Sequence, residues 1–310
     1  MSNVRASLLS RLYVSLFVSC IWVSFTNAQA SKTEILWDSY GVPHVFGKSE
    51  PEMYYAFGWS QMNNHANLLL QLYAQARGKA AEYWGQDYLA SDRLIHLFNI
   101  PGIAGEQYTK QDKHYKHCLD AFVDGVNAFA AAHPEAISAG NKAVLPVKPE
   151  DVIAHIIRVV YLQFAAQEDL DAVVYLARPG SNSLAIGPSR SASKNAMLVA
   201  NPHLPWVDLY TFFEAHLQAP GFNAYGVSLV GMPVLNIAFN NNLGWTYTVN
   251  PIDIVDRYEL TLSGDGYLLD GNITPFKKKD LVLKVKDADG TLQEQHIVLN
   301  YAEQGPVVTL

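Results

Sequence analysis

The dipeptide Gly180–Ser181 combines residue types that can support nucleophilic chemistry. A serine hydroxyl that attacks the preceding carbonyl would move the acyl group from nitrogen to oxygen, and water would then release a new N-terminal serine. The α-amine of such a serine has an unperturbed pKa of about 8, so it can act as general base for its own hydroxyl. Glycine leaves the scissile carbonyl unshielded. The alternative is a surface loop, because serine and glycine dominate turns.

A second polar group, Asp-Ile-Val-Asp at 253–256, could bind a cation. The carboxylates of Asp253 and Asp256 and the backbone carbonyl of Val255 are oxygen ligands, which suit Ca²⁺ with its about 6–8 ligands. A solvated turn with a salt bridge to Arg257 is the alternative.

A metal-dependent hydrolase has little support in the sequence. His114 and His117 lie three residues apart on one predicted helix, but no acid or third histidine obviously converges on them. Neither His-Glu-x-x-His nor Cys-x-x-Cys occurs. Cys118 is interpreted as a buried structural thiol.

The segment before Ser181 is predicted to be mainly helical. Apolar residues recur at helical spacing over Pro51–Trp84, and His114–Ala132 is an amphipathic helix. Pro149 opens a third helix, because proline and the acids that follow it suit a first turn. A short strand is expected within Glu34–Val45.

From Ser183 onward the pattern predicts short strands separated by turns. A hairpin is expected around Asp289–Gly290. Helices followed by antiparallel strands favour an α+β fold over a doubly wound parallel sheet. The expected strands are Ser183–Gly187, Ala196–Ala200, Thr211–Leu217, Pro233–Phe239, Arg257–Leu262, Leu281–Lys286 and Gln295–Leu299.

The composition excludes several classes of protein. Hydrophobic residues make up 49% of the 310 residues and charged residues 16%, which excludes a disordered polyelectrolyte. The net charge of −7 argues against a nucleic-acid-binding partner.

Residues 1–30 have the pattern of a signal peptide. Arg5 and Arg11 precede the apolar run Leu12–Phe25, and Ala28–Ala30 has the small residues of a cleavage site. The run is shorter than the ~20 residues of a membrane-spanning helix, and no second long apolar run follows. We therefore expect cleavage after Ala30, no membrane anchor, and a periplasmic or secreted protein.

Several motifs occur in a specific order along the chain. They are Ile35–His44, Gly58–Gln61, Ala76–Gly85, Gly180–Ser183, Ala200–Leu204, Gly231–Pro233, Asn240, Trp245 and Thr248–Asn250. In this order and spacing they resemble the penicillin acylases, a group of N-terminal-nucleophile (Ntn) hydrolases, and within them the acyl-homoserine-lactone acylase branch. The resemblance covers essentially the whole mature chain.

The resemblance implies a four-layer αββα sandwich. A helical α chain, residues 31–180 with a short spacer at its end, would wrap around the sheets of a β chain that starts at residue 181. The two chains would be cut from one precursor, the zymogen, at Gly180–Ser181 and would stay associated.

The family's site residues carry over to three positions. Ser181 would be the nucleophile, His203 would orient the nucleophile and its amine, and the backbone N–H of Val249 would form half of the oxyanion hole. The family's second donor, an asparagine, would lie beyond Leu310, as would an arginine that positions it. Because losing one such donor costs about 10²–10³ in rate, we expect a truncated chain of 310 residues to be inactive.

Calcium-binding members of the family match Asp253, Val255 and Asp256, and they add an acid near the end of the α chain. Glu168 is the candidate for that acid. The resemblance to these members implies a structural Ca²⁺, whereas the closest acyl-homoserine-lactone acylases need not keep this site. No organic cofactor is expected. The chain departs from the family at Leu184, where tryptophan is usual, and this change is expected to alter the acyl pocket.

The expected activity is hydrolysis of a small-molecule N-acyl amide through an acyl-enzyme. The substrates implied are N-acyl homoserine lactones or penicillin-type β-lactams, and quorum quenching and antibiotic deacylation are both compatible roles. Leu162, Phe164 and Leu204 could line the acyl pocket or belong to the core. The alternative is a non-catalytic, calcium-stabilised periplasmic binding protein.

Overall fold

The computed structural model describes residues 32–165, 180–248 and 255–308, which belong to one compact unit, Lys32–Leu310. The predicted signal peptide lies outside the described residues. So do Glu168, Val249 and Asp253 among the predicted site residues.

The first half is helical, as predicted. A π-helical segment, Arg158–Ala165 (η4), continues the last of its helices. The helices are α2 (Glu50–Ala76), α3 (Ala80–Trp84), α4 (Leu89–Leu97), α5 (Ile100–Lys110), α6 (Lys113–Ala132) and α7 (Pro149–Ile157). Short 3₁₀ turns are η1 (Gln86–Tyr88), η2 (Pro134–Ala136), η3 (Lys142–Val144), η5 (Pro188–Arg190) and η6 (Asp208–Tyr210).

The single long helix expected over Pro51–Trp84 is two helices, so that expectation was wrong. Gly78 takes a positive φ of 65°, a conformation that favours glycine, and the chain turns between α2 and α3. The expected start of α7 at Pro149 and the expected end of α6 at Ala132 are confirmed.

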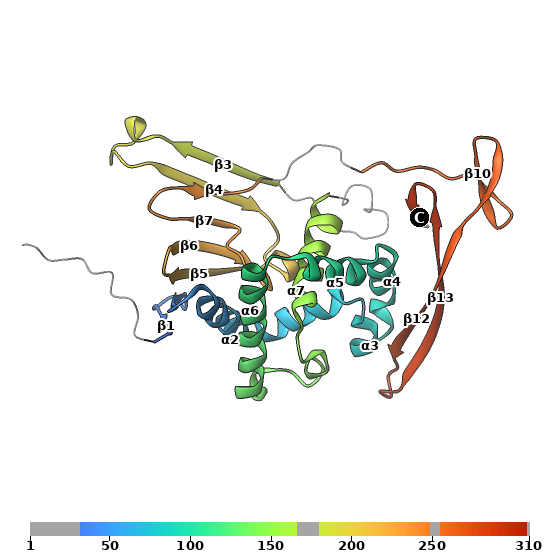
Figure 1. Ribbon diagram of the computed structural model, residues 1–310, viewed down its shortest axis with the longest axis horizontal. Helices are drawn as coiled ribbons and strands as arrows, with labels where there is room; N and C mark the ends of the chain where they lie inside the picture. Colours follow the sequence, from blue (N-terminus) through green and yellow to red (C-terminus); the bar gives the residue numbers. More distant parts are fainter. Residues whose placement is uncertain (1–31, 166–179, 249–254, 309–310) are drawn as a thin grey trace, which may run out of the picture. The chain divides into compact units, whose positions relative to one another are not determined.

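Helices α2 and α6 lie side by side (Figure 1) and approach closely through glycine. A Cβ added at Gly58 would lie 2.1 Å from the carbonyl oxygen of Phe122, and one at Gly125 would lie 1.9 Å from that of Tyr55. Since neither backbone can yield that much space, any side chain at these positions would push the helices apart. The fully buried Phe57 and Phe122 pack edge to face in the same contact.

The main sheet has six strands in the order β1 (Glu34–Trp37), β2 (Pro43–Phe46), β5 (Phe212–Ala219), β6 (Phe222–Leu229), β7 (Ile237–Phe239) and β8 (Gly244–Trp245). Its strand pairs are antiparallel except β2 with β5, which is parallel. The sequence predicted antiparallel pairing only. A parallel pair needs a long crossover connection, and here the whole helical region lies between the two strands.

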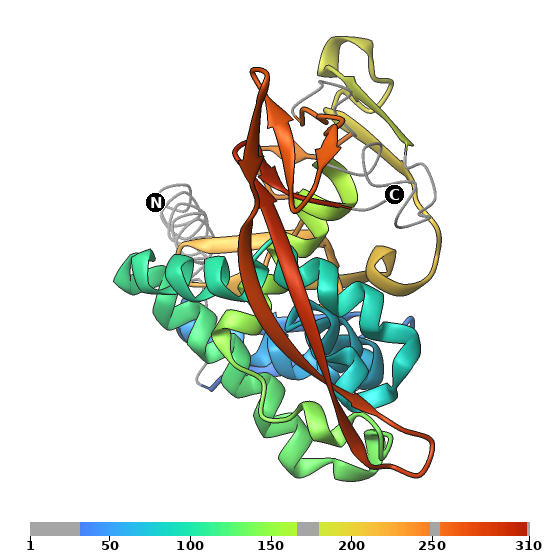
Figure 2. The same ribbon diagram turned by 90° about the vertical axis from the view of Figure 1, so that its right-hand side faces the viewer.

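Strands β3 (Gly180–Ile186) and β4 (Met197–His203) form a separate two-stranded ribbon. The remaining strands are β9 (Leu262–Ser263), β10 (Gly266–Leu269), β11 (Asn272–Pro275), β12 (Lys277–Lys286), β13 (Leu292–Ala302) and β14 (Gly305–Pro306). Figure 2 shows β12 and β13 as the long twisted hairpin that the sequence predicted.

Two strand expectations were wrong. Arg257–Leu262 is not a continuous strand, and only the last three residues of Pro233–Phe239 form one. The sequence analysis also did not predict β6. The fold class is nevertheless confirmed as α+β, with helices in the first half and a mainly antiparallel second half.

Candidate active site

The register of β3 and β4 brings together two of the predicted site residues. Gly180 pairs with His203, and Ser181 pairs with the neighbouring Pro202. A Cβ added at Gly180 would lie 3.7 Å from His203 Nδ1, so the imidazole lies beside the Gly180–Ser181 peptide bond.

The hydroxyl of Ser181 is directed at the carbonyl group that autocleavage would attack. Ser181 Oγ donates a hydrogen bond of 2.6 Å to the carbonyl oxygen of Gly180. The serine is half-buried and is one of the residues that line the cavity described below.

Asn182 contacts the imidazole of His203 at Nε2, the ring nitrogen that does not face Gly180. Its Nδ2 lies 3.3 Å from His203 Nε2. Because an amide nitrogen can only donate, Nε2 accepts, and the neutral ring then carries its proton on Nδ1, the nitrogen that faces Gly180. Sequence reasoning quoted Asn182 as part of a motif but gave it no role.

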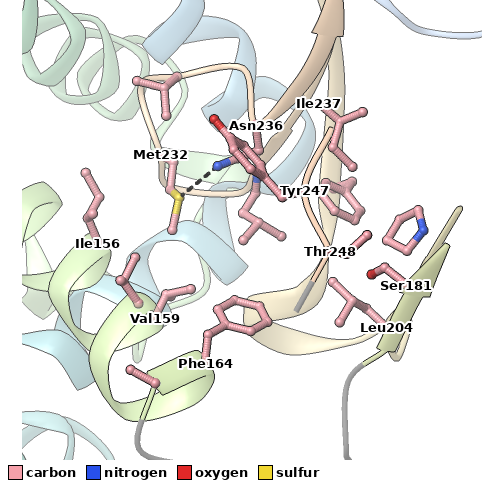
Figure 3. Close-up of a pocket in the computed structure, with 16 residues that line it drawn as sticks. Ile156, Val159, Phe164, Ser181, Leu204, Met232, Asn236, Ile237, Tyr247 and Thr248 are labelled. Carbon is pink, nitrogen blue, oxygen red and sulfur yellow. Dashed lines mark hydrogen bonds between the residues drawn. The ribbon is translucent and has the colours of Figure 1, made fainter. Parts of the chain in front are cut away.

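An apolar cavity of about 480 Å³ opens next to Ser181 (Figure 3). In Figure 3 Ser181 and Leu204 lie on one side of it, and Ile156, Val159 and Met232 lie on the other. Its lining comprises Ile156, Val159, Val160, Phe164, Ala165, Ser181, Pro202, Leu204, Phe212, Leu229, Met232, Val234, Asn236, Ile237, Tyr247 and Thr248.

Two of the three predicted pocket residues line this cavity. Phe164 and Leu204 do, whereas Leu162 packs against the hydrophobic core. The π-helical turns of η4 change which side chains share a face, and the sequence pattern did not reveal this irregularity. Leu184 is 57% exposed and is not among the lining residues, so the expectation that it shapes the pocket was wrong for the described chain.

Among the described residues that line the cavity none is charged. A chamber of this kind accepts apolar groups, since an unpaired charge inside it would be strongly disfavoured. Ser181 Oγ and the polar atoms of Asn236, Tyr247 and Thr248 are the exceptions to its apolar character. The cavity can therefore hold an acyl chain with its carbonyl end near Ser181.

The turn that carries Met232 is held by buried polar groups of the helices. Gln61 accepts from the backbone N–H of Gly231 at 2.8 Å and donates to the carbonyl of Met232 at 2.9 Å. Tyr73 Oη donates to the Gly231 carbonyl at 2.7 Å. Two motifs that the sequence analysis treated separately, around Gln61 and around Gly231, are therefore in direct contact.

Two features of this turn favour glycine at position 231, namely its backbone conformation and the close approach of His155. Gly231 has a positive φ of 87°, and a Cβ there would lie 3.0 Å from the ring of the buried His155. His155 Nε2 lies 3.1 Å from the carbonyl oxygen of Val230. Burial, followed by the nearby charge of Arg158, lowers the pKa of His155 to about 3, so this ring is neutral and structural.

An ion pair fixes the helices that support the cavity. Arg77, just after α2, contacts Asp151 in the first turn of α7 through two bonds, Nε–Oδ1 at 2.6 Å and Nη2–Oδ2 at 2.7 Å. Arg77 also donates to the carbonyls of Val144 and Pro146. Since α7 continues into η4, which supplies Phe164, the pair positions one wall of the cavity.

The predicted calcium ligands are only partly described. Val255 is half-buried and Asp256 is exposed, directly after the undescribed segment that contains Asp253. The four-residue ligand set therefore stays a prediction, as does the role of Val249.

Comparisons with known proteins agree on one family. A family model described as penicillin amidase matches residues 32–310. Similar curated proteins include acyl-homoserine lactone acylase PvdQ of Pseudomonas syringae pv. tomato, 28% identical over 90% of this chain and 42% of that protein. PvdQ of Pseudomonas fluorescens is 26% identical over 97% of this chain and 45% of its own length.

Two further similarities are weaker. Acyl-homoserine lactone acylase QuiP of Pseudomonas fluorescens is 23% identical over 71% of this chain and 34% of that protein. A thermostable penicillin G acylase from Alcaligenes faecalis matches in structure with a TM-score of 0.39 and 22% identity, over 46% of this chain and 83% of that chain. The chain thus spans less than half the length of the PvdQ and QuiP proteins it matches. Within the described residues no helix is both long and apolar enough to cross a membrane.

Proposed function

The chain belongs to the penicillin amidase family, and on this premise we propose that it provides the nucleophile and the acyl pocket of an exported hydrolase of N-acyl amides. The observation that carries the proposal is the position of Ser181. It follows glycine, lies one residue from the partner of His203 across the ribbon, and borders an apolar cavity of about 480 Å³.

Maturation would begin with the Ser181 hydroxyl. Its oxygen attacks the carbonyl carbon of Gly180, the C–N bond breaks, and the nitrogen takes up a proton to leave an ester with a free α-amine. Water then hydrolyses the ester, which releases the Gly180 carboxylate and an N-terminal Ser181. The hydrogen bond from Ser181 Oγ to the Gly180 carbonyl supports this step, because it places the two groups in contact.

Substrate hydrolysis would use the same atoms. The free α-amine of Ser181 takes the hydroxyl proton while Oγ attacks the amide carbonyl, and the proton passes to the departing amine. Water then hydrolyses the acyl-enzyme and regenerates the hydroxyl. His203, held by Asn182, would orient Ser181 from the adjoining strand, and the backbone N–H of Val249 would stabilise the oxyanion.

Long-chain N-acyl homoserine lactones are the substrate class we favour over aryl-acetyl β-lactams. The cavity is lined mainly by aliphatic side chains, and the similar curated proteins are named acyl-homoserine lactone acylases. Burial of each further methylene contributes about 0.8 kcal/mol, so kcat/KM should rise about fourfold per methylene until the cavity is full. Phenylacetyl substrates should fall below the best acyl chain.

Denaturing mass spectrometry of the protein from its exporting cell tests maturation. We expect two chains, the second beginning at Ser181, and one uncut chain for Ser181→Ala. Ser183→Ala is the matched control, since Ser183 is an exposed serine on the same strand and should leave cleavage intact. Two processed chains in Ser181→Ala would refute the assignment.

A non-catalytic binding protein is the competing outcome. It would bind N-acyl amides, remain a single uncut chain and turn over none of them. An acyl-chain series that shows binding without product would therefore favour this alternative.

A structural Ca²⁺ is proposed beside this chemistry. Asp253, Asp256, the carbonyl of Val255 and Glu168 would provide its oxygen ligands. The ion would brace the chain that follows Val249 and would supply no step of the reaction.

A further inference from the structure

Three metal-ligating side chains from two helices meet outside the apolar cavity. Glu50 is the first residue of α2, and His114 and Cys118 lie on α6. His114 Nε2 is 2.9 Å from Glu50 Oε2 and 3.9 Å from Cys118 Sγ. All three ligand atoms lie within 4.8 Å of one another.

We propose that Glu50, His114 and Cys118 form a binding site for one Zn²⁺ ion. A thiolate, an imidazole and a carboxylate are the three ligand types that zinc takes in proteins. Around a tetrahedral zinc with ordinary bond lengths, the nitrogen and oxygen ligand atoms are about 3.4 Å apart and the nitrogen and sulfur atoms about 3.6 Å apart. The observed distances of 2.9 Å for nitrogen–oxygen and 3.9 Å for nitrogen–sulfur therefore lie within about 0.5 Å of that arrangement.

The two helices set this geometry before any ion arrives. His114 and Cys118 are four residues apart, so they project from the same face of α6. The side chain of Asp112 accepts from the backbone N–H groups of His114 and Tyr115 and fixes where α6 begins. Ser49 caps α2 in the same way, and the glycine contacts between the helices hold Glu50 opposite α6.

Charge also favours a divalent cation here. Zinc binding would displace the thiol proton to solvent, and Zn²⁺ with one thiolate, one carboxylate and a neutral imidazole has no net charge. Glu50 and His114 are partly exposed, so water can enter and fill the fourth position.

This site differs in kind from the predicted calcium site. Ca²⁺ is a hard cation that takes oxygen ligands, and a thiolate does not suit it. The sequence analysis set aside His114 with His117 because no acid obviously converged. In the structure Glu50, which lies 64 residues away in the chain, is the acid that does.

Cobalt substitution tests the site, because Co²⁺ bound by a thiolate gives a charge-transfer absorption that other ligands do not. We expect the metal-free protein to bind one Co²⁺ with this absorption, and one Zn²⁺ to displace it. His114→Gln should weaken binding at least about tenfold, and Cys118→Ser should abolish the absorption. His117→Gln removes an exposed neighbouring histidine and should change neither.

Cys118 is buried, so its replacement alone can disturb packing. His114→Gln and Glu50→Gln lie at partly exposed positions and provide the decisive variants. Zinc should raise the melting temperature of the unaltered protein and of His117→Gln, but not that of His114→Gln. Equal Co²⁺ affinity in His114→Gln, or no charge-transfer absorption in the unaltered protein, would overturn the proposal.

Discussion

The helices and the β3–β4 ribbon differ in burial and in the number of tertiary contacts that fix them. Helix α2 is largely buried and is fixed by glycine contacts, by Gln61 and by the Arg77–Asp151 pair. The ribbon that carries Ser181 is mostly exposed, with Leu184 57% and Met197 48% accessible. The helices therefore hold the cavity in shape, while the ribbon carries Ser181 and His203. Substitutions in the helices should therefore lower the free energy of unfolding, whereas substitutions in the ribbon should lower the rates of cleavage and hydrolysis.

Arg77→Ala should give the largest loss of stability. The change leaves Asp151, with 7% side-chain exposure, without its cationic partner and with only the backbone N–H of Lys148 as a donor among the described residues. Removing one partner of a buried ion pair costs about 3–5 kcal/mol. Chemical denaturation of Arg77→Ala against the exposed Lys110→Ala control measures this. A loss below about 1 kcal/mol, the size expected of surface ion pairs, would contradict the role given to this pair.

The Arg77–Asp151 pair illustrates which features of the fold could be predicted from sequence and which could not. Periodicity and capping located α6 and α7, because those signals are local. The bonds of Arg77 to Asp151 and of Gln61 to Gly231 join residues 74 and 170 positions apart, and no local pattern specifies them. Family resemblance supplied Ser181 and His203 as candidates, but only the strand register revealed that Asn182 contacts the histidine.

Asp92 gives the helical region a pH dependence. Burial raises the pKa of this carboxyl from 3.8 to about 6, although the backbone N–H groups of Ala81 and Ala80 oppose the shift. Between those pKa values the folded protein binds more protons than the unfolded chain, so stability should fall as pH rises from about 4 to about 6. A shift of this size corresponds to about 3 kcal/mol.

Denaturation midpoints between pH 4 and pH 7 measure this effect. Asp92→Asn loses the titrating group, so its stability should vary less with pH in that window, whatever its absolute value. Asp87→Asn, an exposed carboxyl nearby, is the control and should keep the slope. An identical slope in Asp92→Asn would show that other groups produce the dependence.

Asp256→Ala tests the predicted calcium site outside the helical region. Ca²⁺ should raise the melting temperature of the unaltered protein, and chelation or Asp256→Ala should remove that rise. At a concentration of one hundred times Kd the stabilisation would be about 2.7 kcal/mol. Melting curves that do not respond to Ca²⁺ or chelator would remove the calcium proposal, while leaving the zinc site untouched, because the two share no ligand.

The smallest effect is expected at Leu184, and a matched leucine makes it informative. Leu70 on α2 is fully buried, so Leu70→Ala should cost about 2–5 kcal/mol. Leu184→Ala should cost less than about 0.5 kcal/mol, because the side chain is 57% exposed on the ribbon. A decrease of about 2 kcal/mol in the free energy of unfolding of Leu184→Ala would contradict the proposed difference between the helices and the ribbon. It would mean that the apolar side chains of the ribbon are covered by contacts beyond those among the described residues, and that the strand carrying Ser181 is held as firmly as the helices.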